Sequence, residues 1–260
     1  MKTEFAAVLL CLMFFFIGPH YGYARTSDKN IHEQELNNLS DRIFQYADAN
    51  QEDAAKNLLS EFDRTWSTSE TAYPDEDGRI VGTVALRLKI LLDSGGNSSE
   101  IRDAAIALRL CVDALTTSGS PLWKAMRSQV LGPIKGMQTS LKNQDYPGFQ
   151  AELNQFLDSY ALIYPSMMID GNPEGVIVVN KSVNAFADQR MSTIQDKMRI
   201  QQLTLIEKEL AGVFDRSPAS TIDSLSPLIL AVGSFLLFVL IYVSLRKYFG
   251  ERFKRRKEIR

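Results

Sequence analysis

The 260-residue chain carries 29 Lys and Arg residues against 31 Asp and Glu residues, which gives a formal net charge of −2 at pH 7. This balance excludes the strongly basic proteins that bind nucleic acids through general electrostatics. With only two His and two Cys residues, the chain also has little material for metal sites or for nucleophilic catalysis.

The N-terminus has the pattern of an export signal. After a short polar start, the segment Phe5–Ile17 contains thirteen residues without a charge. This run is shorter than the roughly 20 residues that span a bilayer, but it fits the hydrophobic region of a secretory signal. Gly22 and Ala24 are small residues at the positions that a signal peptidase reads, so we expect residues 1–24 to be a cleaved signal peptide. The alternative is an uncleaved N-terminal anchor.

Most of residues 25–215 show the periodicity of amphipathic helices, because apolar residues recur at spacings of three and four. Helices are predicted between polar or glycine-rich turns, over residues 36–46, 55–66, 80–92, 98–115, 121–141 and 146–165, the last of them ended by Pro165. Residues 176–179 are β-branched and fit either an extended segment or the start of a helix. One long polar helix is predicted for residues 180–214. We therefore expect an all-α extracytoplasmic domain built as a bundle of helical hairpins.

Two of the predicted hairpins share a sequence pattern. An apolar residue is followed by aromatic residues three and seven positions later, at Leu59, Phe62 and Trp66 and again, 94 positions on, at Leu153, Phe156 and Tyr160. Asn-Gln pairs precede both patterns, at residues 50–51 and 143–144. Either one hairpin unit is used twice, as in helical-repeat proteins, or two ordinary core helices coincide in pattern.

A second apolar segment, Pro227–Leu245, contains nineteen residues and no charge. At 1.5 Å per residue it covers about 28 Å, close to the hydrocarbon thickness of a bilayer. The tail of residues 246–260 holds eight basic and two acidic residues, whereas residues 217–226 hold no Lys or Arg. Because basic residues beside a membrane helix stay in the cytoplasm, the sequence predicts one transmembrane helix with residues 25–226 outside. Residues 216–226 are then a juxtamembrane linker.

The predicted exterior and the tail differ in charge. Residues 25–226 hold 20 basic and 28 acidic residues and are near −8, while the tail is near +6. We expect the tail to contact anionic lipid headgroups, at about 1 kcal/mol per basic residue. The basic residues expected to do so are Arg252, Lys254, Arg255, Arg256 and Lys257. After signal cleavage Cys111 is the one Cys left, and its apolar helical pattern predicts a buried side chain.

No residue pattern indicates a catalytic or cofactor site. His32 is the one His outside the predicted signal peptide, and no second His follows it at the spacing of the HExxH zinc motif. The segment Asp75–Gly78 resembles the middle of a calcium loop, but Tyr73 and Val84 occupy positions that need Asp and Glu ligands. The sequence therefore predicts a protein that is not an enzyme and binds no metal or cofactor, although a glycosidase needs only two carboxylates.

A stretch near the end of the helical domain carries a recognisable set of residues. Within residues 153–190 they are the helix Phe156–Tyr160 and then Tyr164-Pro165-Ser166, Ile169-Asp170 and Pro173-Glu174. This stretch resembles the YpjB-type sporulation proteins of endospore-forming Bacillus relatives, and the layout agrees over nearly the whole chain. The resemblance implies a role in sporulation, in the mother-cell membrane, and brings no catalytic residues with it.

Together these features predict a membrane-anchored helical module that binds a protein or peptide partner outside the membrane. Trp66, Trp123 and Tyr160 are the candidate contacts, with core packing as the alternative because they lie on apolar helix faces. A cell-wall module that binds or hydrolyses peptidoglycan is the second hypothesis. A sensor whose tail contacts a cytoplasmic protein is the third.

Overall fold

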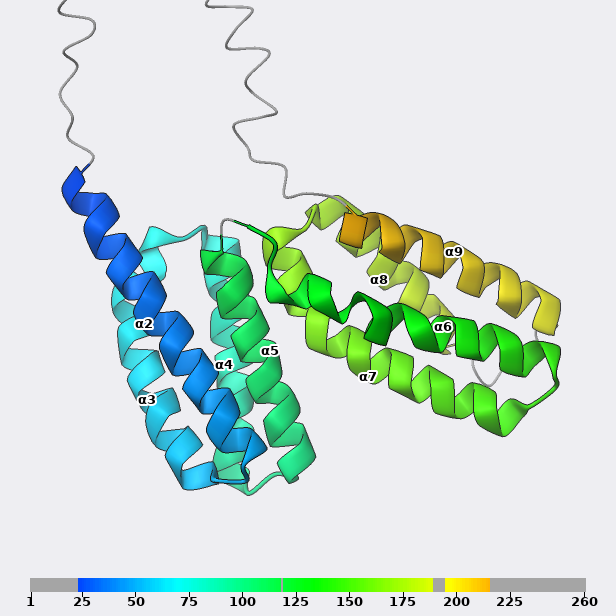
Figure 1. Cartoon of the computed structure of the whole chain (residues 1–260), viewed down its shortest axis with the longest axis horizontal. Coiled ribbons are helices and arrows are strands. Elements are labelled where there is room, and N and C mark those ends of the chain that lie inside the picture. Colours follow the sequence, from blue (N-terminus) through cyan, green and yellow to red (C-terminus); the bar gives the residue numbers. More distant parts are fainter. Residues whose placement is uncertain (1–22, 118, 189–194, 216–260) are drawn as a thin grey trace, which may run out of the picture. The chain divides into compact units, whose positions relative to one another are not determined.

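The computed structural model describes residues 23–117, 119–188 and 195–215 (Figure 1). All regular elements in these ranges are helices, which confirms the predicted all-α class. The long helices are α2 (Tyr23–Asp48), α3 (Glu52–Ser69), α4 (Asp75–Ser94), α5 (Ser98–Thr116), α6 (Arg127–Lys142), α7 (Tyr146–Asp170), α8 (Pro173–Asp188) and α9 (Asp196–Asp215). Two short 3₁₀ helices, η1 (Glu70–Ala72) and η2 (Leu122–Met126), precede α4 and α6.

Several predicted segments lie outside the described residues. They are most of the signal peptide, the linker of residues 216–226, the transmembrane helix of residues 227–245 and the basic tail. Among the helices that are described, none combines the length and the apolar character needed to cross a membrane.

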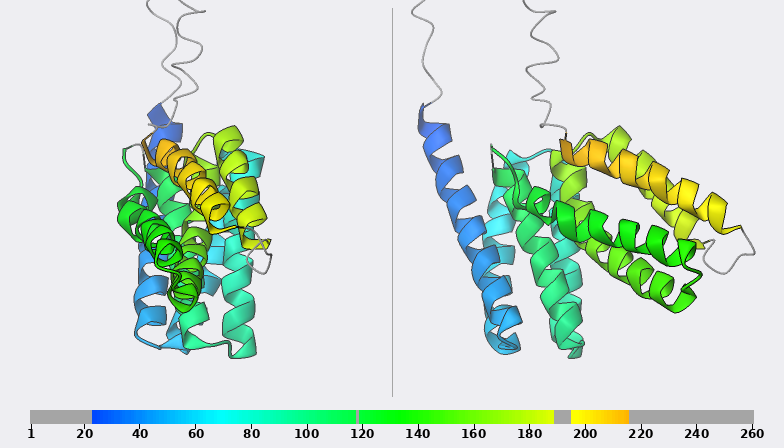
Figure 2. Two further views of the ribbon diagram at one scale, coloured as in Figure 1. Left: turned by 90° about the vertical axis from the view of Figure 1, so that its right-hand side faces the viewer. Right: turned by 45° about the vertical axis from the view of Figure 1, so that its right-hand side comes forward.

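The described helices form two groups, each around its own hydrophobic core. Helices α2 to α5 lie side by side in the first group, and α6 to α9 make up the second (Figures 1 and 2). The largest side chains of the first core include Leu36, Ile43, Phe62, Leu88 and Leu108, and those of the second include Trp123, Ile134, Met137, Leu153 and Phe156. Helices α5 and α7 pack against each other and join the two groups.

The turn between α2 and α3 has the same backbone geometry as the turn between α6 and α7. Asn50 and Gln144, 94 positions apart, both adopt the left-handed conformation, with φ of 55° and 57°. Residues other than glycine rarely take this conformation, so its recurrence is informative. Four backbone hydrogen bonds recur at the same shift. In the first turn, the amides of Ala49, Asn50, Gln51 and Ala55 donate to the carbonyls of Gln45, Ala47, Tyr46 and Gln51, respectively. In the second turn, the amides of Asn143, Gln144, Asp145 and Phe149 donate to the carbonyls of Thr139, Leu141, Ser140 and Asp145, respectively.

The core positions follow this shift as well. Five buried residues of α2, Leu36, Leu39, Ser40, Ile43 and Ala47, correspond to buried residues of α6, namely Val130, Pro133, Ile134, Met137 and Leu141. Five of α3, Ala55, Leu59, Phe62, Trp66 and Ser69, correspond to Phe149, Leu153, Phe156, Tyr160 and Ile163 of α7. An exception is buried Leu58, which corresponds to the partly exposed Glu152.

The correspondence extends less strictly to the remaining helices. Of the six buried residues of α4, Ala85 and Leu92 match buried Val179 and Phe186 of α8 at the same shift, and the other four do not match buried residues. Buried residues of α5 and α9 match at a shift of 99, as Ala104, Ala107, Cys111 and Ala114 against Leu203, Ile206, Leu210 and Val213. The agreement of turn, hydrogen bonds and core favours one helical hairpin used twice, as α2–α3 and as α6–α7. We call α2 to α5 the first repeat and α6 to α9 the second repeat.

The sequence predicted that Pro165 ends its helix, but this prediction is wrong because α7 continues to Asp170. A proline inside a helix leaves the carbonyl four residues earlier without its amide partner. That carbonyl belongs to Ala161, which is exposed, so water can solvate it. Beyond the proline, Ser166 and Met167 are buried, and their packing stabilises the last turns of α7.

The single long helix predicted over residues 180–214 is also wrong, because α8 ends at Asp188 and α9 begins at Asp196. The Ser182 hydroxyl of α8 donates a hydrogen bond to Glu209 of α9 over 2.9 Å. In one straight helix these two residues would lie about 40 Å apart. The segment 176–179, for which the sequence left two interpretations open, is part of α8.

Candidate functional site

The three aromatic residues proposed as partner contacts all lie in the cores. Trp66, Trp123 and Tyr160 are 6 %, 0 % and 5 % exposed. Trp66 stacks on Phe62 and Tyr73 in the first repeat, with ring centroids 6.2 and 5.7 Å away. The other two belong to the core of the second repeat, so the structure does not bring the three together. Their burial favours core packing, the alternative interpretation, and contact with a partner stays a prediction.

Trp123 ties three elements of the second repeat together. Its indole Nε1 donates to Asp170 Oδ2 at the end of α7 over 3.2 Å, and its ring lies 5.1 Å from that of Phe214 in α9. Lys124 Nζ lies 3.5 Å from the same carboxylate oxygen, and the Asp170 side chain is only 6 % exposed. A buried carboxylate needs such partners, so we interpret this cluster as structural: it holds η2, the end of α7 and α9 together. The one sequence signal for this cluster was Asp170, an acidic residue directly after the apolar run that ends α7.

The buried thiol and phenol groups are held in their protonated forms. Burial raises the pKa of Cys111 from 9.0 to about 12, against a smaller lowering by the Ser166 hydroxyl, whose oxygen lies 3.7 Å from the sulfur. Burial also raises the pKa of Tyr160, and the neighbouring Tyr164 adds to this effect. The predicted burial of Cys111 is confirmed, and at neutral pH its thiol is a small apolar side chain.

The acidic segment that resembles a calcium loop forms the first turn of a helix. Asp75, Glu76 and Asp77 begin α4, where the positive end of the helix dipole favours carboxylates. Over the described residues, no three or more His, Cys, Asp or Glu side chains gather in a way that could hold a metal ion. His32 lies in α2, with Nδ1 3.9 Å from Glu35.

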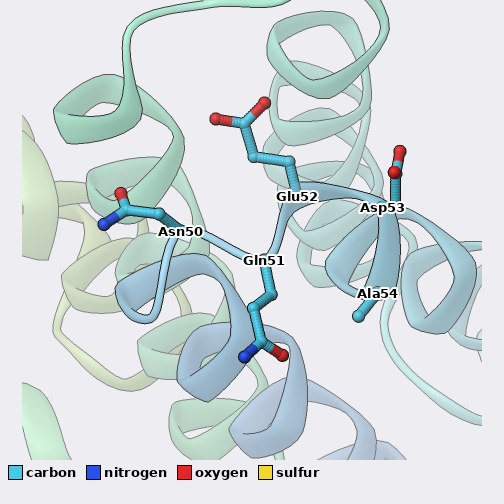
Figure 3. Close-up of a pocket in the computed structure, with 5 residues that line it drawn as sticks. All are labelled: Asn50, Gln51, Glu52, Asp53 and Ala54. Carbon is cyan, nitrogen blue, oxygen red and sulfur yellow. The ribbon is translucent and has the colours of Figure 1, made fainter.

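An open hollow lies at the turn between α2 and α3, lined by Asn50, Gln51, Glu52, Asp53 and Ala54. Figure 3 shows the carboxylates of Glu52 and Asp53 on one side of the turn and the amide of Gln51 on the opposite side. The side chains do not converge on one point, so this is an exposed acidic surface and not a cage for a small ligand. We call these five residues the acidic turn.

The equivalent turn of the second repeat has the same backbone but a different surface. Asp145 there accepts a hydrogen bond from the Gly148 amide and so caps α7. Exposed Tyr146 replaces Glu52, and its hydroxyl donates to Asp196 over 3.1 Å. The asymmetry extends over the whole units: residues 23–117 hold 17 acidic and 10 basic residues, and residues 119–215 hold 10 and 9. The recurring pattern and the Asn-Gln pairs at residues 50–51 and 143–144 had already linked these two turns, but the sequence alone did not show that their surfaces differ.

Comparison with known proteins places the chain in a family. The profile described as "Sporulation protein YpjB (SpoYpjB)" matches residues 33–257. The chain belongs to the YpjB family of sporulation proteins. A curated relative, "Uncharacterized protein YpjB" of Bacillus subtilis (strain 168), is 26 % identical over 264 residues, which cover 99 % of this chain and 98 % of the relative. No solved structure matches the chain significantly.

The match to the YpjB family begins within α2 and runs through both repeats. It confirms the resemblance first seen in residues 153–190. The five basic residues expected at lipid headgroups, Arg252, Lys254, Arg255, Arg256 and Lys257, fall in the matched range but outside the described residues.

Proposed function

We propose that this protein serves spore development as a non-catalytic module that is anchored in the mother-cell membrane and binds a protein or peptide partner outside it. Membership of the YpjB family supports the role in sporulation. The uncharged segment of residues 227–245 and the basic tail after it support the anchor and its direction.

One observation supports partner binding above the others: two repeats with matching cores carry unequal surfaces. The core positions of α2 and α3 recur in α6 and α7, whereas the excess of acidic residues lies in the first repeat. Charged surface residues contribute little to the stability of a helical core. The difference in surface charge between the two repeats therefore points to a role in recognition. The partner then presents a basic segment to the first repeat, and the acidic turn is the contact surface we favour.

The matched turns provide the experiment and its control. A photo-reactive amino acid is introduced at Ala49 or at Asn143, which are equivalent exposed positions beside the two turns. In sporulating cells we expect a discrete cross-linked product from position 49 and none from position 143. Replacing Glu52 and Asp53 by their amides should reduce the product at position 49. Equal labelling at both positions, or none at either, contradicts partner binding by the acidic turn.

The anchor and the alternative function have separate tests. Truncation after Ser226 should release the protein from the membrane fraction, and continued sedimentation with membranes would contradict anchoring by residues 227–245. If purified peptidoglycan retains the full chain, or is cleaved by it, the cell-wall hypothesis replaces the peptide-binding one. Substituting the basic tail residues by Gln should lower binding to anionic vesicles without affecting the cross-link.

A further inference from the structure

The outer face of α4 carries an apolar pair beside an unfilled space. Leu86 and Ile90 are each 56 % exposed and, four residues apart, lie next to each other on the same face of the helix. Gly82 lies one turn earlier on this face, and a Cβ placed on it would meet nothing within 4 Å. Glycine inside a helix is less stable than alanine, and no contact within the described chain requires its small size.

This face is complementary to itself about Leu86. Gly82 and Ile90 lie four residues before and after Leu86, and Arg79 and Asp93 lie seven residues before and after it. Steps of four and seven keep all five residues on one face of a helix. When two copies of α4 pack antiparallel about a twofold axis at Leu86, Ile90 of each copy covers Gly82 of the other. Arg79 of each copy then faces Asp93 of the other.

We propose that the protein forms a homodimer in which two copies of α4 pack antiparallel through this face. The occupant is a second copy because the face offers both halves of each match, a large side chain for a small one and a cation for an anion. A twofold interface requires such self-complementarity. An unrelated apolar partner does not require it.

The charged ends of the face fit the proposed dimer. Asp93 is already paired with Lys56 over 2.6 Å, yet its side chain remains 45 % exposed and can accept a second cation. Arg79 is exposed at the other end. These pairs lie at the rim, where charges set orientation more than affinity, so they favour the antiparallel arrangement over the parallel one.

Disulfide trapping tests the dimer in the full chain. Helix axes about 8–10 Å apart bring facing Cα atoms to roughly 5 Å, within the range of a disulfide. Membranes that contain the full chain with Leu86→Cys and Cys11→Ser are mildly oxidised, and the rate at which disulfide-linked dimers form is measured. The remaining Cys111 is buried and does not compete. Leu205→Cys, on α9, is the matched control because Leu205 is 53 % exposed.

We expect the Leu86→Cys chain to cross-link at least about tenfold faster than the Leu205→Cys chain, because dimer formation raises the effective concentration of the thiols at position 86. Adding Gly82→Gln to the Leu86→Cys chain should remove this advantage by filling the space that Ile90 of the second copy occupies. Equal rates at positions 86 and 205, or a rate unaffected by Gly82→Gln, would overturn the proposal.

Mixed chains test the register. Chains with Gly82→Cys and chains with Ile90→Cys should cross-link to each other when co-expressed and hardly at all to themselves. Self-linking of Gly82→Cys chains in preference to the mixed product would show parallel packing and would overturn the antiparallel dimer.

Discussion

Phe62 and Phe156 offer a quantitative test of the repeat. They occupy equivalent positions in α3 and α7, and both are fully buried. Phe62 lies 6.2 Å from the ring of Trp66, and Phe156 lies 5.9 Å from the ring of Tyr160. Truncating either residue to alanine removes a ring from a packed core and costs about 3–5 kcal/mol. Because the two environments correspond, we expect the two losses to agree within about 1 kcal/mol.

Denaturant unfolding of the full chain in a mild detergent measures these losses. The chain has two Trp residues, Trp66 in the first repeat and Trp123 in the second, so fluorescence of Trp66→Phe and Trp123→Phe backgrounds reports each repeat separately. The exposed neighbours supply controls: Glu61→Ala and Gln155→Ala, at equivalent positions, should change the free energy of unfolding by no more than about 0.5 kcal/mol.

Two results would refute this reasoning. A cost below about 1 kcal/mol for one phenylalanine and 3–5 kcal/mol for the other would show that the cores are not equivalent. Separate transitions for Trp66 and Trp123 would show that the contact between α5 and α7 does not couple the repeats. We expect a single transition for both.

Other substitutions test single features of the fold. Gly82→Ala should raise the stability of the dilute protein by about 0.5–1 kcal/mol, because the added methyl group meets open space. Gly95→Ala should lower it by about 1 kcal/mol, since Gly95 ends α4 with φ of 64°. Cys111 should resist thiol reagents until the chain unfolds, because burial raises its pKa from 9.0 to about 12. Asp170→Ala should cost about 1–3 kcal/mol by leaving its buried hydrogen-bond donor without an acceptor, whereas the exposed Asp158→Ala should be near neutral.

The shift at Cys111 also predicts the direction of a pH effect. The unfolded chain loses the thiol proton near pH 9.0, while the folded chain keeps it until about pH 12. The unfolded state therefore binds fewer protons between these values, and stability falls as the pH rises through this window. Cys111→Ala should show a shallower fall than the natural chain. An equally steep fall would assign the effect to other groups, including Tyr73, whose pKa burial raises to about 12.

The sequence predicted the helices well where one helix buries one regular stripe. Leu59, Phe62 and Trp66 are all in the core, as their spacing indicated. It failed at Pro165, because a local rule for proline does not include the packing of Ser166 and Met167 that continues α7. It also failed between Asp188 and Asp196, because a polar stretch that continues a helix and one that separates two antiparallel helices look alike in hydropathy.

The sequence by itself determined the all-helical class, the burial of Cys111 and the family to which the chain belongs. The helical class and the burial of Cys111 follow from periodicity, which is local and needs no knowledge of contacts. The family was indicated by the resemblance that residues 153–190 carry. Only the tertiary structure favours repetition of a hairpin over coincidence, because the left-handed turns at Asn50 and Gln144 align at the shift that also aligns the buried residues of α2 and α3 with those of α6 and α7. It also decided that the conspicuous tryptophans pack inside, since a helix has the same apolar stripe whether that stripe meets its own chain or another.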